Sequence, residues 1–347
     1  MKWNDAMSKL AKLSSLVADE KLEKTGMFGV LHFFPDGYVY SSNGFFEFEL
    51  YYGGDFRGAV PASKFYDVVK VLDQGVAYDV LVEDGFFVIR NSAGEVRINM
   101  IQVDQVVNRI GPVLSRGELE SSVQVDWRDE LLKVLRRESE VASSGSSSVE
   151  YRVIYFDRRG VFATDRVRVV CYFVPFIVGE SAVLLSVNGI RQLVEIAGEE
   201  HIVGAWVIDG RLFVKFDGEF YVGVLGYDIE YPDVVGVLLG HKEKVERVDV
   251  DVSVSDEISK IVKILDPSDV LYLVVDNGWL ELKVNSLKGF EWKKKLQRVN
   301  IEGEYVVGVL ARDLDGVIDG GVELGFSNSV LYVRSVEGVE YVVSIVV

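Results

Sequence analysis

The sequence predicts an α+β fold built from three tandem units, each with two helices and several antiparallel strands. Most of the 347 residues alternate between apolar and polar side chains as strands do, and Val, Ile, Phe and Tyr are frequent. A few segments instead carry apolar residues at helical spacing. These segments recur at nearly constant distances along the chain, which indicates an internal repeat.

Two sets of helices are expected. The first set opens each unit with an apolar stripe, such as Ala6, Leu10, Leu13 and Val17. The second set is shorter and has apolar residues at positions i, i+3 and i+4. The first set spans 3–19, 126–140 and 255–265, and the second lies at 65–72, 190–197 and 314–318.

Between the helices, pairs of short apolar runs surround tight turns. Asp84-Gly85 and Asp209-Gly210 are strong signals for two-residue hairpins, because these residue types tolerate a left-handed backbone. Ser327 to Ser329 is a weaker turn signal. The sequence therefore predicts hairpins over 76–90, 202–217 and 322–334.

The spacing of these elements defines the repeat. The first helices are marked by Lys9, Lys133 and Lys260, which are 124 and 127 residues apart. The second helices repeat after 125 and 124 residues, and two hairpin turns after 125. We therefore expect three domains, at 1–117, 118–238 and 239–347.

The composition argues against several classes of protein. The chain has 37 Lys and Arg against 54 Asp and Glu, a net charge of −17, which disfavours a protein that coats nucleic acid with its whole surface. With Cys171 as the single cysteine and three scattered histidines, neither a disulfide framework nor a metal or cofactor site is expected. No apolar run is long enough for a membrane span, and the N-terminal segment lacks a signal-peptide core, so a cytoplasmic protein is expected.

Cations recur in register on the first helices. Each helix carries a cation, two apolar residues and a second cation, and residues three apart lie on one helix face. In so acidic a chain, three equivalent cationic faces favour phosphate binding over ordinary solvation. The pairs are Lys9/Lys12, Lys133/Arg136 and Lys260/Lys263, with Arg137 beside the second pair and Lys64 and Arg191 on second helices.

Two short segments carry a likeness to a known family. Phe162 to Val170 contains Ala-Thr-Asp-Arg-Val-Arg-Val, and Glu230 to Leu238 contains Tyr-Pro-Asp followed by Val-Leu. In this order and within this triple repeat, they resemble the Ala-Thr-Asp-Gly-His-Arg-Leu and Phe-Pro-Asp-Tyr…Val-Leu segments of bacterial-type DNA sliding clamps, the processivity factors of replicative polymerases. The chain departs from that pattern at Arg166-Val167, where the family has Gly-His. Low similarity elsewhere is consistent with a divergent clamp from a virus or mobile element, in which case the host cytoplasm is the expected location.

The resemblance implies that two three-domain chains form a homodimer, closed head-to-tail into a ring with helices around the hole and strands outside. Duplex DNA would pass through the hole, held by loose contacts to phosphate that carry no sequence information. The cations implied to line the hole are Lys9, Lys12, Lys64, Lys133, Arg136, Arg137, Arg191, Lys260 and Lys263. By position, Val96 and Ile98 would lie on one side of the dimer joint, and Ile264 and Leu265 on the other.

The resemblance also implies a pocket between the second and third domains, into which DNA polymerase and clamp-loader tails insert a short motif. The family often has methionine where this chain has Ser344, which questions whether the chain accepts the usual bacterial peptide. The residues implied to line the pocket are Thr164, Arg168, Val169, Pro232 and Val237, with Val343, Ser344 and Val346 closing over it.

Two other classes of function stay open at this point. An enzyme would need a catalytic set, yet the acidic segment Asp313 to Gly320 lacks the spacing of a calcium loop, and no base or nucleophile accompanies the carboxylates. A structural or scaffolding β-rich protein with no DNA role would account for the repeats and the acidity but not for cations in register. The third unit's second helix, with Arg312 as its cation, fits a DNA-facing helix poorly.

Overall fold

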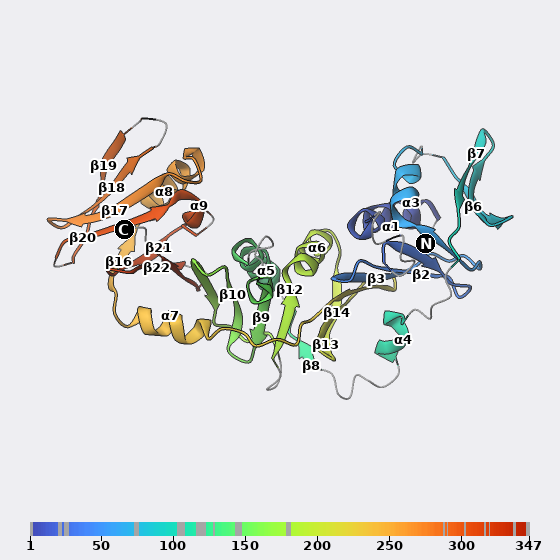
Figure 1. Ribbon diagram of the computed structural model, residues 1–347, viewed down its shortest axis with the longest axis horizontal. Coiled ribbons are helices and arrows are strands. Elements are labelled where there is room, and N and C mark those ends of the chain that lie inside the picture. The colour runs from blue at the N-terminus through green and yellow to red at the C-terminus, as the bar shows by residue number, and fades with distance from the viewer. Residues whose placement is uncertain are drawn as a thin grey trace. The chain divides into compact units, whose positions relative to one another are not determined.

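A computed structural model shows an α+β fold in which the sheets are antiparallel (Figure 1). The structure describes residues 3–19, 23, 28–72, 76–102, 108–115, 123–127, 129–142, 148–177, 182–286, 289, 291–301, 303–315, 317–318, 320–335 and 338–344. No helix within these ranges is long and apolar enough to cross a membrane.

The chain folds into two compact units. Unit 1 comprises Met1–Leu132 and Ile177–Asp228, and unit 2 comprises Lys133–Phe176 and Ile229–Val347. Each unit takes segments from two of the expected domains, because strands of neighbouring repeats join in one sheet. The division into three domains at 117 and 238 stays a prediction.

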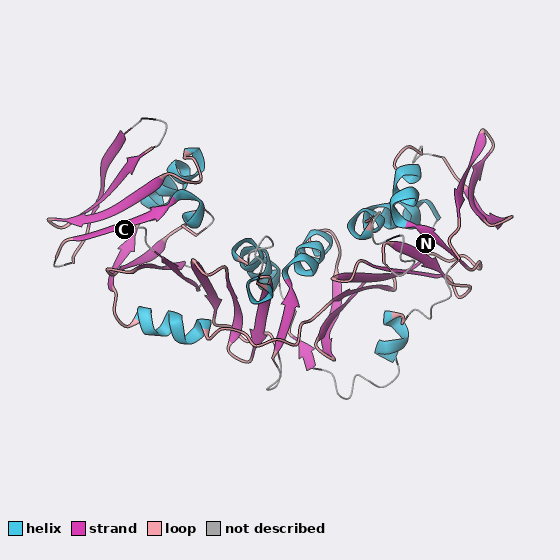
Figure 2. Ribbon diagram, viewed as in Figure 1, coloured by secondary structure: helices cyan, strands magenta, loops and turns pink. Residues whose placement is uncertain are grey.

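Unit 1 has helices on both faces of its main sheet (Figure 2). Its helices are α1 (Trp3–Val17), α3 (Ala62–Val69), α4 (Ile110–Ser115) and α6 (Val187–Ala197). Its strands are β1 (Val30–Phe33), β2 (Tyr38–Ser42), β3 (Phe46–Tyr51), β4 (Gly58–Pro61), β5 (Asp79–Glu83), β6 (Phe86–Asn91), β7 (Gly94–Asn99), β8 (Val123–Val125), β12 (Val183–Ser186), β13 (Ile202–Ile208), β14 (Arg211–Phe216) and β15 (Phe220–Val224).

The main sheet of unit 1 joins strands of the first and second repeats in the order β4-β1-β2-β3-β15-β14-β13-β8. The join is the antiparallel pair of β3 and β15, in which Phe48 lies opposite Val222. Helices α1 and α6 lie on one face of this sheet, and α4 lies on the other (Figure 2). The join therefore has one face that bears α1 and α6 and an opposite face covered by the short connector helix α4.

The two predicted Asp-Gly hairpins are confirmed. Asp84 and Gly85 between β5 and β6 have φ values of 50° and 80°, and Asp209 and Gly210 between β13 and β14 have 49° and 72°. Both residues of each turn are thus left-handed, as a two-residue hairpin matched to the strand twist requires. Strands β5, β6 and β7 form a separate sheet in that order.

Unit 2 is built in the same way. Its helices are α5 (Asp129–Val141, whose first turn falls in unit 1), the 3₁₀ helix η2 (Val149–Tyr151), α7 (Val234–Lys242), α8 (Val252–Ile264) and α9 (Ala311–Leu314). Its strands are β9 (Val153–Asp157), β10 (Gly160–Thr164), β11 (Arg168–Tyr172), β16 (Glu246–Val250), β17 (Val270–Asp276), β18 (Trp279–Asn285), β19 (Glu291–Arg298), β20 (Tyr305–Leu310), β21 (Val322–Phe326), β22 (Val330–Ser335) and β23 (Val339–Ser344).

The strands of unit 2 form two sheets. The first contains β9-β10-β11-β23-β22-β21-β16 and joins the second and third repeats where β11 pairs with β23, with Val169 opposite Val342. The second has the order β19-β18-β17-β20. Connector helix α7 contacts β10, β11, β22 and β23 at the join. Its position relative to its sheet matches that of α4 in unit 1.

The three predicted first helices are confirmed as α1, α5 and α8. The second helix expected at 314–318 is wrong in extent: α9 ends at Leu314, because Asp315 has an extended backbone with φ −62° and ψ 127°. Val317 and Ile318 are nevertheless buried. Their apolar spacing reflected core packing rather than a helix.

Candidate functional site

The first helices of the second and third repeats present cations to solvent. Lys133 and Arg136 on α5 and Lys260 and Lys263 on α8 are all exposed, whereas Arg137 is half-buried. The apolar stripes of both helices are buried, so the cations stand on the opposite faces. Among the described residues, none of these four exposed cations forms an ion pair. They are available to an anionic partner.

The equivalent cations on α1 are paired within unit 1. Lys9 Nζ lies 2.8 Å from a carboxylate oxygen of Glu200, and Lys12 Nζ lies 2.6 Å from one of Glu199. Lys9 Nζ also lies 4.2 Å from the centre of the Phe220 ring, at cation–π distance. The sequence analysis predicted Lys9 and Lys12 as cations that face DNA phosphate, and it did not foresee their carboxylate partners.

The second helices contribute fewer cations. Lys64 on α3 and Arg191 on α6 are exposed. Arg312 on α9 is exposed and lies 3.5 Å from the carboxylate of Asp313 on the same helix. Gly316 and Asp319 of the acidic segment fall outside the described residues.

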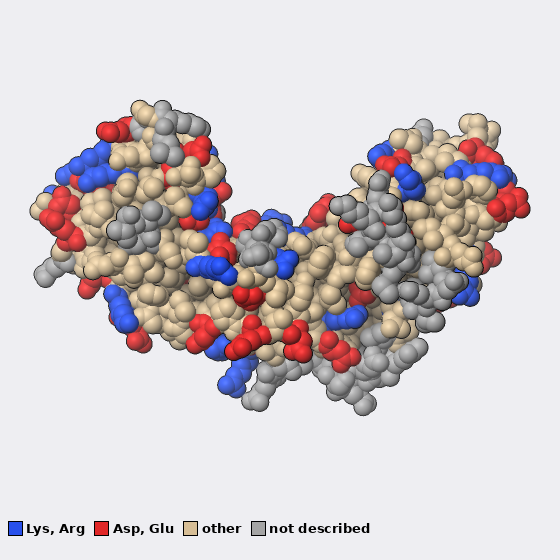
Figure 3. All heavy atoms as spheres, in the orientation of Figure 1, with Lys and Arg blue, Asp and Glu red and all other residues tan. Residues whose placement is uncertain are grey.

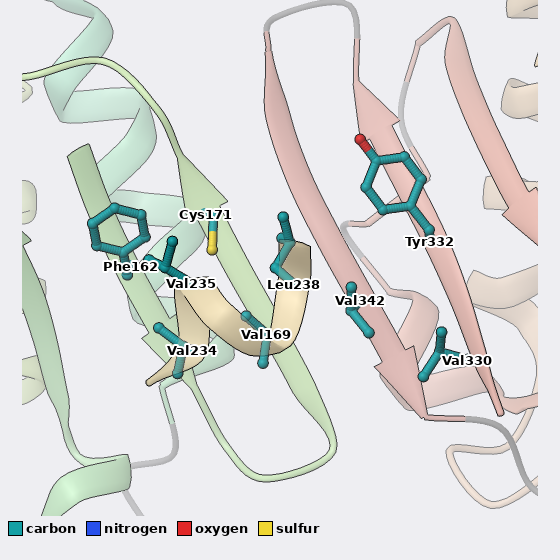
Figure 4. Close-up of a cluster of buried hydrophobic side chains, with 9 residues drawn as sticks. All are labelled: Phe162, Val169, Cys171, Val234, Val235, Leu238, Val330, Tyr332 and Val342. Carbon is teal, nitrogen blue, oxygen red and sulfur yellow. The ribbon is translucent and has the colours of Figure 1, made fainter. Parts of the chain in front are cut away.

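A cluster of buried apolar side chains lies where α7 covers the join of β11 and β23. Figure 4 shows the side chains of α7 against those of the strands. The cluster, called the α7 cluster below, consists of Phe162, Val169, Cys171, Val234, Val235, Leu238, Val330, Tyr332 and Val342. At the surface around it, Val167 and Val237 remain 37% and 49% exposed. Exposed apolar side chains beside a buried cluster are suited to bind apolar groups of a partner.

The turn between β10 and β11 is fixed by its own side chains. The Thr164 hydroxyl donates to the Arg168 carbonyl oxygen at 2.7 Å. The Asp165 carboxylate accepts from the backbone N–H groups of Val167 and Arg168 and pairs with the Arg168 guanidinium at 2.9 Å. The turn therefore holds Val167 at a defined place beside the cluster.

Arg166 in this turn has a left-handed backbone, with φ of 82°. Such a conformation is strained for a side chain other than glycine, asparagine or aspartate. Two contacts accompany it: the guanidinium lies 4.6 Å from the centre of the Tyr151 ring and donates to the Ser148 hydroxyl at 3.1 Å. Glycine adopts this conformation without strain, so a Gly at this position, as in the clamp segment that this turn resembles, fits the same backbone.

The C-terminal strand completes this surface. The backbone N–H of Ser344 donates to the Val167 carbonyl oxygen at 2.9 Å, and Val343 lies opposite Arg168 in the strand register. Val343 is buried and Ser344 is exposed. Of the eight residues predicted for the pocket, Thr164, Arg168, Val169, Val343 and Ser344 are thus brought together on β10, β11 and β23.

The other predicted pocket residues lie on the connector. Pro232 precedes α7 and is half-buried, and Val237 is exposed on α7. Asp233 is the N-cap of α7, and its carboxylate accepts from the Gly236 N–H at 2.9 Å. Val346 falls outside the described residues. Sequence analysis missed Tyr332, Val330 and Val342, although the alternation along β22 and β23 was a usable signal.

The corresponding surface of unit 1, under α4, is charged. Glu49 is fully buried and accepts two hydrogen bonds from Arg109, whose guanidinium also lies between the Phe34 and Tyr38 rings at 4.7 and 4.8 Å. The Gly111 N–H donates to the same carboxylate at 2.7 Å. Burial raises the pKa of nearby Glu47, which accepts a hydrogen bond from Tyr40.

The predicted dimer-joint residues lie on β7 in unit 1 and at the end of α8 in unit 2. Ile98 on β7 is buried and Val96 is half-buried. Ile264 at the end of α8 is 73% exposed, whereas Leu265 is buried. Basic side chains gather over β18 and β19 (Figure 3), where Lys283, Lys293 and Lys295 surround the carboxylate of Glu281 at 3.2 to 3.7 Å.

One buried carboxyl stands apart from these surfaces. Glu138 on α5 is fully buried, and neither of its carboxyl oxygens has a hydrogen-bond partner among the described residues. Burial raises its pKa well above the usual value. No group of His, Cys, Asp and Glu side chains in the described ranges is arranged to hold a metal ion.

Several solved protein structures match this arrangement of helices and strands over nearly the whole chain. The DNA polymerase III β subunit of Caulobacter crescentus superimposes with a TM-score of 0.82 and 18% identity, covering 100% of this chain and 99% of that one. The β subunit of Pseudomonas aeruginosa gives 0.77 and 18%, covering 99% and 98%. The fold is that of a bacterial DNA sliding clamp.

The likeness is structural rather than sequential. A Helicobacter pylori β clamp, solved bound to a DNA ligase peptide, superimposes with a TM-score of 0.76 at only 14% identity, covering 100% of this chain and 99% of that one. No protein-family model matches the sequence, and no curated protein sequence matches it. The sliding-clamp fold is therefore retained over the full length with little sequence identity.

Proposed function

We propose that this protein is a DNA sliding clamp that encircles duplex DNA and tethers a replicative polymerase for processive synthesis. The observation that carries the proposal is the match to sliding clamps over 98–100% of both chains, with no part of the fold left over. The repeated cationic helices support it independently, because their pattern is a property of the sequence and does not depend on the structural match. The three domains 1–117, 118–238 and 239–347 are part of this proposal.

The DNA contacts proposed here are electrostatic. Lys133 and Arg136 on α5 and Lys260 and Lys263 on α8 are exposed cations without carboxylate partners among the described residues. Contacts of this kind to phosphate carry no sequence information and exchange easily, which suits sliding. A ring that encloses DNA needs no tight contact, because release requires the ring to open.

Two strand pairs inside the chain, β3 with β15 and β11 with β23, serve as the model for ring closure. In each pair, the third strand of one run of three consecutive strands pairs with the third strand of another run. The remaining third strands, β7 and β19, each lie at one edge of their sheet and have no strand partner on that side among the described residues. A second copy of the chain could supply the missing partner at each edge, so that two chains close head-to-tail.

The internal joins also give the register of this proposed joint. Glu49 on β3 and Cys171 on β11 each pair with the third residue of the strand before them. Lys295 on β19 also pairs with the third residue of the strand before it, so these three positions are equivalent. Tyr221 and Glu340 each pair with the fifth residue, as Glu95 does on β7.

Because Glu49 lies opposite Tyr221 and Cys171 opposite Glu340, Lys295 is expected opposite Glu95 of the second copy. The same register turns Val96 and Ile98 of β7 toward the helix side of the joint. The end of α8, with Ile264 and Leu265, belongs to that joint in this proposal, and so does Val71, which is 75% exposed beyond α3. Ile264 of one partner and Val71 of the other, both strongly exposed, are expected to be buried on closure.

The surface around the α7 cluster is the proposed site for polymerase and clamp-loader tails. It combines exposed Val167 and Val237 with the strand end at Ser344, which suits an apolar anchor of a short peptide. The clamp of Helicobacter pylori was solved with a DNA ligase peptide, which supports peptide binding for this fold in general.

The test is retention on DNA of different topology. The protein, loaded on nicked circular plasmid, is expected to co-elute with it in gel filtration and to be lost when the plasmid is linearised. Changing Lys133, Arg136 and Lys263 to Glu is expected to abolish retention, whereas reversing Lys215, Lys244 and Arg334, cations outside these helices, is not. Equal retention on circular and linear DNA would contradict the proposal, and a scaffolding protein would show no retention on either.

A further inference from the structure

The cation pairs of the three first helices are not equivalent in their surroundings. Those of α5 and α8 are exposed and without carboxylate partners among the described residues, whereas those of α1 contact Glu199 and Glu200. All four residues of the two α1 ion pairs belong to unit 1. The chain therefore supplies its own anions at the position where a clamp would present cations to DNA.

The two glutamates sit where a helix disfavours them. Helix α6 ends at Ala197 with Gly198 as its C-cap, so Glu199 and Glu200 follow directly at the negative end of the helix dipole. A carboxylate there is unfavourable relative to a neutral residue. The α1 lysines are the cations that offset this cost, which indicates that the placement serves the contact between α1 and the end of α6.

The two ion pairs differ in burial. Lys9 and Glu200 have side chains 16% and 29% exposed, and Lys9 also lies over the Phe220 ring. Lys12 and Glu199 are 33% and 68% exposed. An exposed ion pair contributes little net free energy, so its carboxylate can be replaced by another anion at small cost. The Lys9 pair is more shielded and holds α1 to the second repeat.

We propose that Glu199 competes with DNA phosphate for Lys12, so that DNA engages α1 only by displacing this carboxylate, while Glu200 and Lys9 brace the first repeat against the second. The inference rests on the proposed clamp function. It predicts that the protein holds DNA mainly through α5 and α8 as long as Glu199 stays paired with Lys12. Contact with α1 is then gained or lost at low cost as the DNA moves.

The adjacent glutamates are their own matched controls, because Glu199→Gln and Glu200→Gln change the net charge equally. Binding of a short fluorescent duplex is measured by anisotropy over a salt series. Glu199→Gln is expected to make the slope of log K against log salt concentration steeper by about 0.9, the value for one added phosphate contact. The ratio of its DNA affinity to that of wild type is then expected to rise about threefold as the salt concentration is lowered from moderate to low. Adding Lys12→Gln is expected to abolish the gain.

Glu200→Gln is expected to leave the salt slope unchanged and to lower the thermal unfolding midpoint, since it breaks a shielded pair. The exchange at Lys12 is overturned if wild type binds DNA and Glu199→Gln leaves the slope unchanged, or if the gain persists with Lys12→Gln. Wild type that shows no salt-dependent DNA binding and no retention on circular plasmid would overturn the clamp function itself, and this inference with it.

Discussion

Each unit joins two repeats through an antiparallel strand pair covered by a connector helix, yet the two covered surfaces have opposite chemistry. In unit 1, β3 turns Glu47 and Glu49 toward α4. In unit 2, the equivalent positions of β11 carry Val169 and Cys171, which pack under α7. One topological position has thus become a charged contact in one unit and an apolar surface in the other.

The difference has a functional consequence. In unit 1 the carboxylate of Glu49 is satisfied by Arg109 and by the Gly111 N–H, so the connector is held by hydrogen bonds of the chain itself. A peptide with apolar anchors would have to displace them and bury a carboxylate without a partner. In unit 2 Val167 and Val237 remain exposed. A partner is therefore expected at the second join and not at the first.

The largest effect is expected at Arg109. Its side chain is 14% exposed and Glu49 is fully buried, so Arg109→Ala leaves a buried carboxylate with one hydrogen bond in place of three. Removing one partner of a buried pair costs about 3–5 kcal/mol. Urea unfolding should show a loss of that size, and Arg109→Ala with Glu49→Met should recover most of it. A loss below about 1 kcal/mol would show that the charged contact does not hold the connector.

Unit 2 buries a carboxyl, Glu138, that has no such partners among the described residues. Glu138→Leu should raise the free energy of unfolding by about 1–3 kcal/mol, because it removes a buried polar group without a hydrogen bond to that part of the chain. The pKa of Glu138 is raised by burial above 4.5, so the contribution of this carboxyl to wild-type stability should be largest below that pH and fall as pH rises toward the folded-state pKa. The gain of the variant should therefore grow with pH. A pH-independent gain would mean that the pKa of Glu138 is the same in the folded and the unfolded protein, and would contradict the raised pKa.

Peptide binding should separate the two joins. Val237→Asp places a charge on the surface around the α7 cluster and should weaken binding of peptides from replicative polymerases and clamp loaders at least tenfold, about 1.4 kcal/mol. Val203→Asp is the matched control, since Val203 is 54% exposed on β13 in unit 1. Both should unfold like wild type. Equal peptide affinity of the two variants would place the partner site elsewhere.

The smallest effect is expected at Arg166. Arg166→Ala keeps the left-handed backbone and loses the contacts with Tyr151 and Ser148, whereas Arg166→Gly loses the contacts and relieves the strain. The Gly variant should be the more stable by about 1 kcal/mol, the cost of a left-handed conformation for a residue with a side chain. Equal stability of the two variants, measured by urea unfolding, would argue against backbone strain at this turn.

Local patterns predicted the elements of this fold well. The first helices follow from apolar stripes, and the Asp84-Gly85 and Asp209-Gly210 hairpins follow from residues that tolerate positive φ. The connector helix α7 was missed because Gly236 and Gly240 interrupt it and it lacks a clear apolar stripe. The hairpin at Asn277-Gly278 was missed although its turn residues carry the same signal.

What the sequence could not supply is pairing between distant segments. Lys9 and Lys12 have the same local pattern as Lys260 and Lys263, and only the folded chain brings Glu199 and Glu200 beside the first pair. The sequence likewise shows Glu47 and Glu49 on β3 and Val169 and Cys171 on β11, but not that these positions are equivalent at the two joins. Which of the two faces becomes charged or apolar at the joins depends on strand register, which is set by long-range pairing.

The measurement that tests the clamp function most directly is covalent closure of the proposed ring. Glu95→Cys with Lys295→Cys, treated with a short bismaleimide on nicked circular plasmid, should give a cross-linked dimer that stays on the plasmid in about 1 M salt, where ionic contacts are screened, and leaves when the plasmid is cut. The native Cys171 is fully buried and should not react. Release from the intact circle after cross-linking, or cross-linking confined to a single chain, would contradict encirclement of DNA by a head-to-tail ring.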